Sequence, residues 1–207
     1  MFDFKKEFKE LYQPKAAPSI IDVPEMMFIA VDGEGDPNTS AEYAAAIEVL
    51  YGLSYAIKMS NKAIMEYTVA PLEGFWSVAD DWFKGKGTAI TDKSAFVWTA
   101  VIRQPDFMTE EVFEDAKVVL AKKKPGLDLL KAHLEKLTEG LCVQALHIGS
   151  YDDEPTTIVA MEQFAVDAGY NVDINDQRRH HEVYLSDPRR VAPEKLKTIV
   201  RHPIQKA

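Results

Sequence analysis

The chain has 207 residues, 46% of them hydrophobic, which is enough to bury a substantial core in one domain or in two small repeats. Its formal net charge is −9, with 24 basic residues spread among 33 acidic ones, and this argues against a direct nucleic-acid partner because phosphate binding needs clustered Lys and Arg. The single cysteine excludes an internal disulfide, and no apolar run is long enough for a signal peptide or a membrane span. We therefore expect a cytoplasmic protein without a membrane partner.

The first predicted elements are strands around one long helix. Residues 1–24 contain three prolines and are expected to form an irregular arm. An apolar run predicts a strand over 26–33, and a capping box that begins at Thr39 predicts the start of an amphipathic helix. Two further segments, 64–69 and 96–103, have the composition of strands.

The middle of the chain is predicted to be helical. Thr109 has the side chain and the position of an N-cap for a helix that ends at the Pro-Gly pair 125–126. Leucines then recur at helical spacing over 127–137, which predicts a second helix there. These helices, within 109–138, are expected to be an insertion between two halves of the fold.

A similar order of elements returns towards the C-terminus. The sequence predicts a strand over 141–148, a helix that starts at the acidic segment 152–155, and a short strand over 181–185 followed by a polar tail. The repeated order predicts an α+β fold with two similar halves, about 25–104 and 140–204. We expect an antiparallel sheet with helices on one face and a ligand cleft on the other.

The strand over 181–185 carries the main candidate residues. Val183 and Leu185 alternate with Glu182 and Tyr184, so the two pairs point to opposite faces of the sheet. We expect the aliphatic pair to pack against helices and the polar pair to face the cleft. A carboxylate that loses hydration in a cleft should have a raised pKa, which suits a general base, and the neighbouring phenol can hydrogen-bond to a water or a ligand. Alternatively, both polar residues lie on a sheet face that is exposed to solvent.

Aromatic residues are candidates for holding a ligand, because flat molecules stack on them and cations bind over their rings. Each is alternatively a core residue, since strand periodicity alone does not say which face of a sheet is core. Adjacent His180 and His181 point to opposite faces of their strand and are not expected to bind a metal together. The candidate ligand-binding residues are Trp76, Trp82, Trp98, Tyr67, Phe75, Tyr151 and His147.

Four segments, in this order along the chain, resemble a known family: FIAVDGEGDP at 28–37, VAPLEGFW at 69–76, WTAVIRQP at 98–105 and HEVYLSDPRR at 181–190. The family is the GyrI-like small-molecule-binding family, also called the AraC-type effector-binding domain. The resemblance covers roughly residues 20–204 and is to the stand-alone subgroup. In regulators the module follows a DNA-binding helix-turn-helix, for which the arm at 1–24 is too short and too rich in proline.

The resemblance implies a domain over 25–207, built from two strand-helix-strand-strand units related by a pseudo-two-fold axis. The family's cleft lies between the two units, is lined with aromatic residues and carries a carboxylate at its centre. This favours the interpretation in which Glu182 and Tyr184 face a cleft.

The resemblance also implies a function. Some stand-alone members hydrolyse the cyclopropane ring of DNA-alkylating natural products and so detoxify them, others only bind ligands, and the name-giving member binds DNA gyrase. For this chain we expect a hydrophobic or cationic aromatic small molecule as partner, with no metal and no nucleotide cofactor. Glu182 is the candidate base or water-orienting group, and Tyr184 the candidate hydrogen-bond donor. The alternatives are a non-catalytic binding or sensing protein and a gyrase-interacting protein, and the oligomeric state is open.

Overall fold

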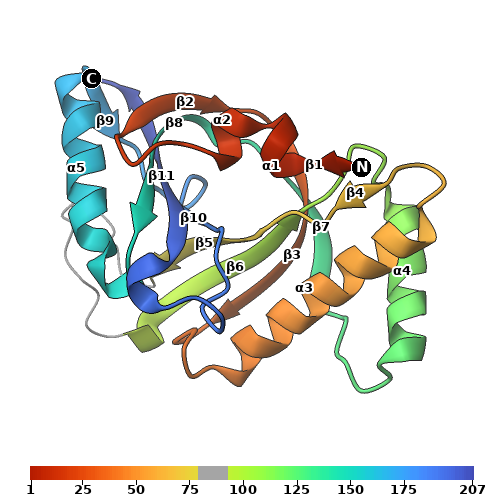
Figure 1. Ribbon diagram of the computed structural model, residues 1–207. Coiled ribbons are helices and arrows are strands. Elements are labelled where there is room, and N and C mark those ends of the chain that lie inside the picture. Colours follow the sequence, from red (N-terminus) through yellow and green to blue (C-terminus); the bar gives the residue numbers. More distant parts are fainter. Residues whose placement is uncertain (79–92) are drawn as a thin grey trace.

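The computed structural model describes residues 1–78 and 93–207, and Figure 1 shows their arrangement. The helices are α1 (Phe4–Glu7), α2 (Lys9–Tyr12), α3 (Ala41–Ser60), α4 (Glu110–Lys123) and α5 (Glu154–Asp167). The strands are β1 (Phe2–Asp3), β2 (Ser19–Val23), β3 (Met26–Glu34), β4 (Tyr67–Thr68), β5 (Leu72–Val78), β6 (Phe96–Arg103), β7 (Ala132–Leu137), β8 (Gly140–Ile148), β9 (Tyr170–Val172), β10 (His180–Tyr184) and β11 (Lys197–Lys206).

One large antiparallel sheet organises the molecule, with the strand order β2-β8-β11-β10-β5-β6-β3-β7 and with β9 paired to β11. Its centre contains two units of the same order, β3-α3-β5-β6 and β8-α5-β10-β11. The units meet where β10 pairs with β5. From this junction the strand order is β5, β6, β3 on one side and β10, β11, β8 on the other, so the two units have equivalent arrangements. The predicted α+β fold with two similar strand-helix-strand-strand halves is confirmed.

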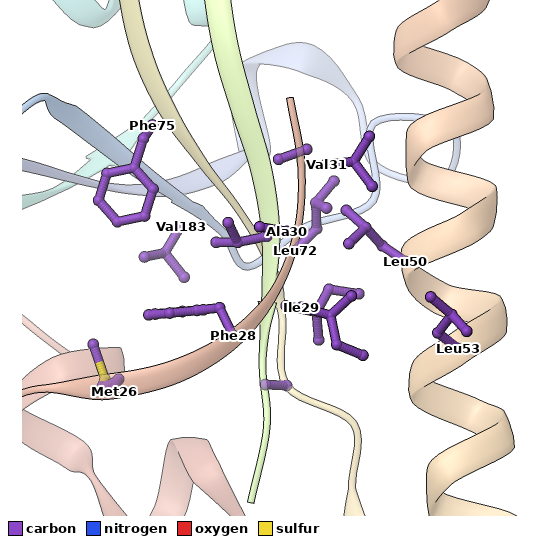
Figure 2. Packing of buried hydrophobic residues seen from close by; sticks show 14 of the residues in the cluster. Met26, Phe28, Ile29, Ala30, Val31, Leu50, Leu53, Leu72, Phe75 and Val183 are labelled. Atoms are coloured by element: carbon purple, nitrogen blue, oxygen red, sulfur yellow. The ribbon is translucent and has the colours of Figure 1, made fainter. Parts of the chain in front are cut away.

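Both long helices of these units pack on the same face of the sheet. Met161 and Ala165 of α5 pack against Val143 and Val200 of the second half. In the first half, Figure 2 shows the leucines of α3 facing the aliphatic side chains of β3 on one side of that strand. The strand alternation therefore gives this face a hydrophobic patch under each helix, with β5 and β10 between the two patches.

The opposite face of the sheet is covered by the N-terminal segment. Phe28, Phe75 and Val183 lie together on this face (Figure 2) and belong to the same buried cluster as Leu11 and Tyr12 of α2. Val183, which is predicted to pack against helices, lies in this cluster with α2, whereas the long helices α3 and α5 cover the other face. The predicted irregular arm is corrected, since its residues form two short helices and two strands.

The middle of the chain contains one helix rather than two. Thr109 caps α4 as predicted, and its hydroxyl accepts a hydrogen bond from the Val112 amide at 3.2 Å. The helix predicted over 127–137 is wrong: Ala132–Leu137 is β7, which pairs with the edge of β3. Leu130 is 90% exposed, so the leucine spacing makes no buried stripe. The backbone groups of β3, which need a partner strand, decide the structure here.

Three other segments differ from the sequence prediction. Helix α3 has Ser40 rather than Thr39 as its N-cap, and the Ser40 hydroxyl accepts from the Tyr43 amide at 3.2 Å. The strand predicted over 64–69 shrinks to β4, while the aromatic segment after it forms the central strand β5. The predicted polar tail contains β11, whose residues from Thr198 to Ile204 are buried. Among the described residues, none of the helices has the length and hydrophobicity to cross a bilayer.

The close approach of β3 to Trp98 generates a stability prediction. A Cβ atom at Gly33 would lie 2.3 Å from the ring of Trp98, which is fully buried. We expect Gly33→Ala to lower the free energy of unfolding by about 1–3 kcal/mol, because a packed indole has no room to move. Gly126 has no atom within 4 Å of the same position, so Gly126→Ala is the control. Equal midpoints of the two variants in urea denaturation would contradict this packing.

Candidate functional site

An open cavity of about 1450 Å³ lies over the central strands β5 and β10, between α3 and α5. Tyr43 and Tyr51 of α3 line one side, and Tyr151 and Ile158 line the other. The sequence predicts a cleft on the face opposite the helices, whereas the cavity lies on the face that carries them. The cavity forms there because α3 and α5 each cover their own hydrophobic patch. Neither helix covers the polar and aromatic side chains of β5 and β10 between the patches.

The floor of the cavity is a hydrogen-bonded array on adjacent strands. The Tyr184 hydroxyl donates to Glu182 Oε2 at 2.6 Å, and Trp76 Nε1 donates to the Tyr184 hydroxyl at 3.0 Å. Gly74, directly opposite Glu182 in the sheet, makes this possible: a Cβ atom there would lie 2.6 Å from Trp76 Nε1 and 3.1 Å from the Tyr184 oxygen. The predicted pair, Glu182 and Tyr184, is thus brought together with one predicted aromatic residue.

Two carboxyl groups on the floor have opposite pKa shifts. Burial raises the pKa of Glu182, but hydrogen bonds from His180 and Tyr184 outweigh it and leave that pKa below its usual value. Burial and the neighbouring charge of Glu182 raise the pKa of Glu154 well above its usual value. We therefore expect Glu182 to be ionised and Glu154 to be protonated at neutral pH. The prediction of a raised pKa for Glu182 is wrong, because it considered desolvation and left out the donors.

A chain of buried side chains continues from Glu182 towards α5. His180 Nε2 lies 2.8 Å from Glu182 Oε1, and His180 Nδ1 lies 2.6 Å from His202 Nε2. His202 Nδ1 in turn lies 2.9 Å from Glu162 Oε1. Burial lowers the pKa of His202 to about 4, so this imidazole is neutral near pH 7. These residues, with Glu154, are functional candidates that the sequence analysis missed.

Some of the predicted aromatic residues line the cavity. Trp76 lies on its floor, and Tyr151 stands at its side with its ring edge-on to Tyr184 at 5.9 Å between centroids. Tyr43 and Phe96 also line it and contact Trp76, at 5.8 and 5.2 Å between centroids, although the sequence analysis did not single them out. The aromatic lining is thus continuous from α3 across the floor to the start of α5.

Four other candidates, Trp98, Phe75, Tyr67 and His147, are described by the structure and do not line the cavity. Trp98 is buried beneath Tyr43, and Phe75 lies on the opposite face with its ring stacked on His181 at 4.1 Å. Tyr67 packs against Phe4 and Phe107 in the core. His147 is bound to Thr157 Oγ1 and to the carbonyl of Ser150, where it fixes the start of α5. Trp82 lies outside the described residues.

Residues 16–205 match the sequence model of the GyrI-like small molecule binding domain. The chain belongs to the GyrI-like family. It is also similar to three solved structures from Listeria innocua. An uncharacterized conserved protein is 44% identical, with a TM-score of 0.92 over 99% of this chain and 100% of that one. One hydrolase is 43% identical, with a TM-score of 0.89 over 99% of this chain and 100% of that one. A second hydrolase is 45% identical, with a TM-score of 0.88 over 99% of both chains. None of the curated proteins matches it in sequence.

The floor of this GyrI-like domain also contains a group with the composition of a metal site. Among the described residues, Glu154, His180 and Glu182 offer ligand atoms that all lie within 4.8 Å of one another. The same side chains are joined to one another by hydrogen bonds. A cation would have to displace those shared protons, so we interpret the group as a proton-sharing cluster.

The opposite ionisation states predict different effects of two similar substitutions. In Glu154→Gln a neutral amide replaces a neutral carboxyl and still donates a hydrogen bond, so the free energy of unfolding at neutral pH should change by less than about 1 kcal/mol. In Glu182→Gln the ionised acceptor of His180 is lost, and we expect a decrease of about 2–4 kcal/mol. Urea denaturation measures both. A cost for Glu154→Gln as large as that for Glu182→Gln would show that Glu154 is ionised.

The raised pKa of Glu154 also predicts how the stability of the protein changes with pH. The unfolded chain loses the Glu154 proton above about pH 4.3, whereas the folded chain keeps it because the pKa of Glu154 is raised. Folding then requires proton uptake, so raising the pH from about 5 to about 8 should destabilise the wild type relative to Glu154→Gln. A constant difference between the two proteins over that range would contradict the assignment.

Proposed function

We propose that the chain binds flat, hydrophobic or cationic aromatic small molecules in the cavity and hydrolyses the cyclopropane ring of a DNA-alkylating natural product. The observation that carries this proposal is the ionised Glu182, held by Tyr184 and His180 on a rigid strand at the bottom of an aromatic cavity. The similarity over almost the whole chain to two Listeria innocua hydrolases supports a hydrolytic reaction. Such an activity would detoxify the compound in the cytoplasm.

The walls suit a planar ligand. Trp76 is fixed by its hydrogen bond to Tyr184, so its ring is already oriented before a ligand arrives. Tyr43 and Tyr151, on opposite sides of the floor, offer further ring surface. A cation over these rings would also be attracted by the charge of Glu182. The chemistry of the lining thus favours aromatic compounds of low polarity, including positively charged ones.

The reaction needs a positioned water and a stabilised oxygen. Glu182 accepts a hydrogen bond from a water that attacks a cyclopropane carbon, and the O–H bond of that water breaks as its proton passes to the carboxylate. The C–C bond of the strained ring breaks, and its electron pair moves into the conjugated carbonyl, whose oxygen becomes negatively charged. Once Glu182 has taken the proton of the water, the Tyr184 hydroxyl can donate to that oxygen instead of to Glu182 and so stabilise its charge. That oxygen becomes a hydroxyl when the proton held by Glu182 is returned to it, which restores the carboxylate. The sum is the addition of one water, with no oxidant, reductant or cofactor.

A non-catalytic binding or sensing protein is the second candidate. The observation that favours it is the lowered pKa of Glu182, because a carboxylate that already accepts from His180 and Tyr184 is a weak base. Binding uses the same aromatic walls and needs no activated water. The two functions therefore differ in turnover and not in affinity.

Incubation of the purified chain with a cyclopropane-bearing DNA-alkylating compound tests the proposal, with the water-added product detected by mass spectrometry. We expect turnover in the wild type, a loss on the order of 100-fold in Glu182→Gln and on the order of 10-fold in Tyr184→Phe, with stacking affinity nearly unchanged. Tyr67→Phe is the matched control, because Tyr67 lies in the core and its hydroxyl has no partner within the described residues. A chelator should leave the rate unchanged.

Three outcomes would revise the proposal. Stoichiometric binding without product favours the binding protein. Turnover that is undiminished in both Glu182→Gln and Tyr184→Phe shows that other residues carry the reaction. An equal loss in Tyr67→Phe would mean that the measured effect is one of folding.

A further inference from the structure

Glu154 and Glu182 place two carboxyl groups side by side on the floor of the cavity. Glu154 is the first residue of α5 and is 5% exposed, and Glu182 lies on β10 with a side chain that is 14% exposed. One oxygen of Glu154 lies within 4.8 Å of one oxygen of Glu182, and both residues line the cavity. Two negative charges this close together in a site of low hydration repel each other strongly, so the pair holds one negative charge and one proton.

The hydrogen bonds around the pair favour Glu154 as the carrier of this proton. Glu182 accepts from His180 Nε2 at 2.8 Å and from the Tyr184 hydroxyl at 2.6 Å, and Glu154 is its third donor. Glu154 Oε1, by contrast, is buried and has no hydrogen-bond partner among the described residues. A negative charge on Glu154 would therefore lack donors of its own and would remove one donor from Glu182.

The titratable groups around the pair do not compensate a second negative charge there. They are Tyr184 and His180 from β10, His202 from β11, Tyr43 from α3, and Tyr151 and Asp152 from the segment before α5. Burial and the charge of Glu182 raise the pKa of each of the three tyrosines, so they stay neutral. Burial keeps His202 neutral, and Asp152 is paired with Lys93 at 2.8 Å. A positive charge that enters the cavity therefore acts on the proton that the carboxyl pair shares.

We propose that this pair adjusts the charge of the cavity to that of the ligand: Glu154 keeps its proton beside a neutral aromatic ligand and releases it when a cationic one binds. The inference rests on the part of the proposed function that concerns ligand binding and does not require hydrolysis. On release, the O–H bond of Glu154 breaks and the proton passes to water, so the pair gains one negative charge as the ligand brings one positive charge. The site thus accepts either kind of ligand without leaving a buried charge uncompensated.

The position of the aromatic floor supports this coupling. Trp76 Nε1 is connected to Glu182 Oε2 through the Tyr184 hydroxyl, by hydrogen bonds of 3.0 and 2.6 Å. A cation bound over the ring of Trp76 is therefore close to Glu182 and to the carboxyl group beside it. In a cavity with little water its field is weakly screened, so it favours ionisation of Glu154 without having to touch it.

The proposal gives the sign of a pH effect on binding. A proton that is released on binding must be taken up by the solution, so the affinity for a cation should rise with pH. The rise is up to tenfold per pH unit over the range in which Glu154 is protonated in the free protein and ionised in the complex. A neutral ligand of the same shape releases no proton, and its affinity should not depend on the state of Glu154.

The probes 1-methylquinolinium and 1-methylnaphthalene have the same shape and differ by one positive charge. Titration calorimetry of the wild type between about pH 6 and about pH 8, in two buffers of different ionisation enthalpy, should show release of up to one proton with the cation and none with the hydrocarbon. In Glu154→Gln the cation should bind without proton release and with an affinity independent of pH. Asp187→Asn is the matched control and should behave as the wild type does. Asp187 also lines the cavity, but hydrogen bonds from Arg189 lower its pKa to about 2, so it has no proton to release.

A spectroscopic measurement on the wild type locates the proton without a variant. In 13C spectra of glutamate-labelled protein, one carboxyl signal should move from the position of the acid to that of the carboxylate as the cation is added. A signal that does not move, or proton release that persists unchanged in Glu154→Gln, would overturn this inference. Binding of both probes without any proton release would overturn it alone, whereas a failure of both probes to bind would overturn it together with the ligand-binding part of the proposed function.

Discussion

Burial of charge on the central strand β10 is the constraint on which the rest of the structure depends. This strand joins the two halves of the sheet, and its successive side chains point to opposite faces. On one face His181 lies between Glu73 Oε2 at 2.9 Å and Glu139 Oε1 at 3.0 Å. On the other face Glu182 lies between its own donors. Because a buried charge without partners is strongly unfavourable, both faces must supply them.

The two faces meet this requirement differently. Around His181 the partners are enclosed: Arg201 binds Glu139 at 3.2 Å and donates to the carbonyl of Leu11 at 2.9 Å, while Tyr12 donates to Glu73 at 3.0 Å. Burial disfavours the charged form of His181, but the two carboxylates outweigh it and raise its pKa. The N-terminal segment is thereby held over this face. Around Glu182 no comparable cover is seen among the described residues, because α3 and α5 stand apart and leave the cavity between them.

Strand alternation is the part of the site that sequence predicts well. It places Glu182 and Tyr184 on one face, and the same parity that separates His180 from His181 places His180 beside them. The position of His202 in the site is not predictable from the sequence. Its segment has the composition of a polar tail, and the pairing of β11 with β10 is a long-range contact. Aromatic content predicts a stacking surface but not which aromatic residues form it. Trp76 and Trp98 are paired on adjacent strands, yet Trp76 lines the cavity while tertiary packing buries Trp98 beneath Tyr43. The leucines of 127–137 show the same limit, since the free edge of β3 overrides their helical spacing.

We propose that the buried cluster on β10 directs a water at a strained ring. A single turnover in 18O-labelled water, with the product and the intact protein both analysed by mass spectrometry, tests this claim most directly. The account predicts that the ring-opened product carries the label at the carbon that was attacked and that the protein mass is unchanged. A product without the label, or a covalent adduct on the protein, would show that a side chain and not water opens the ring.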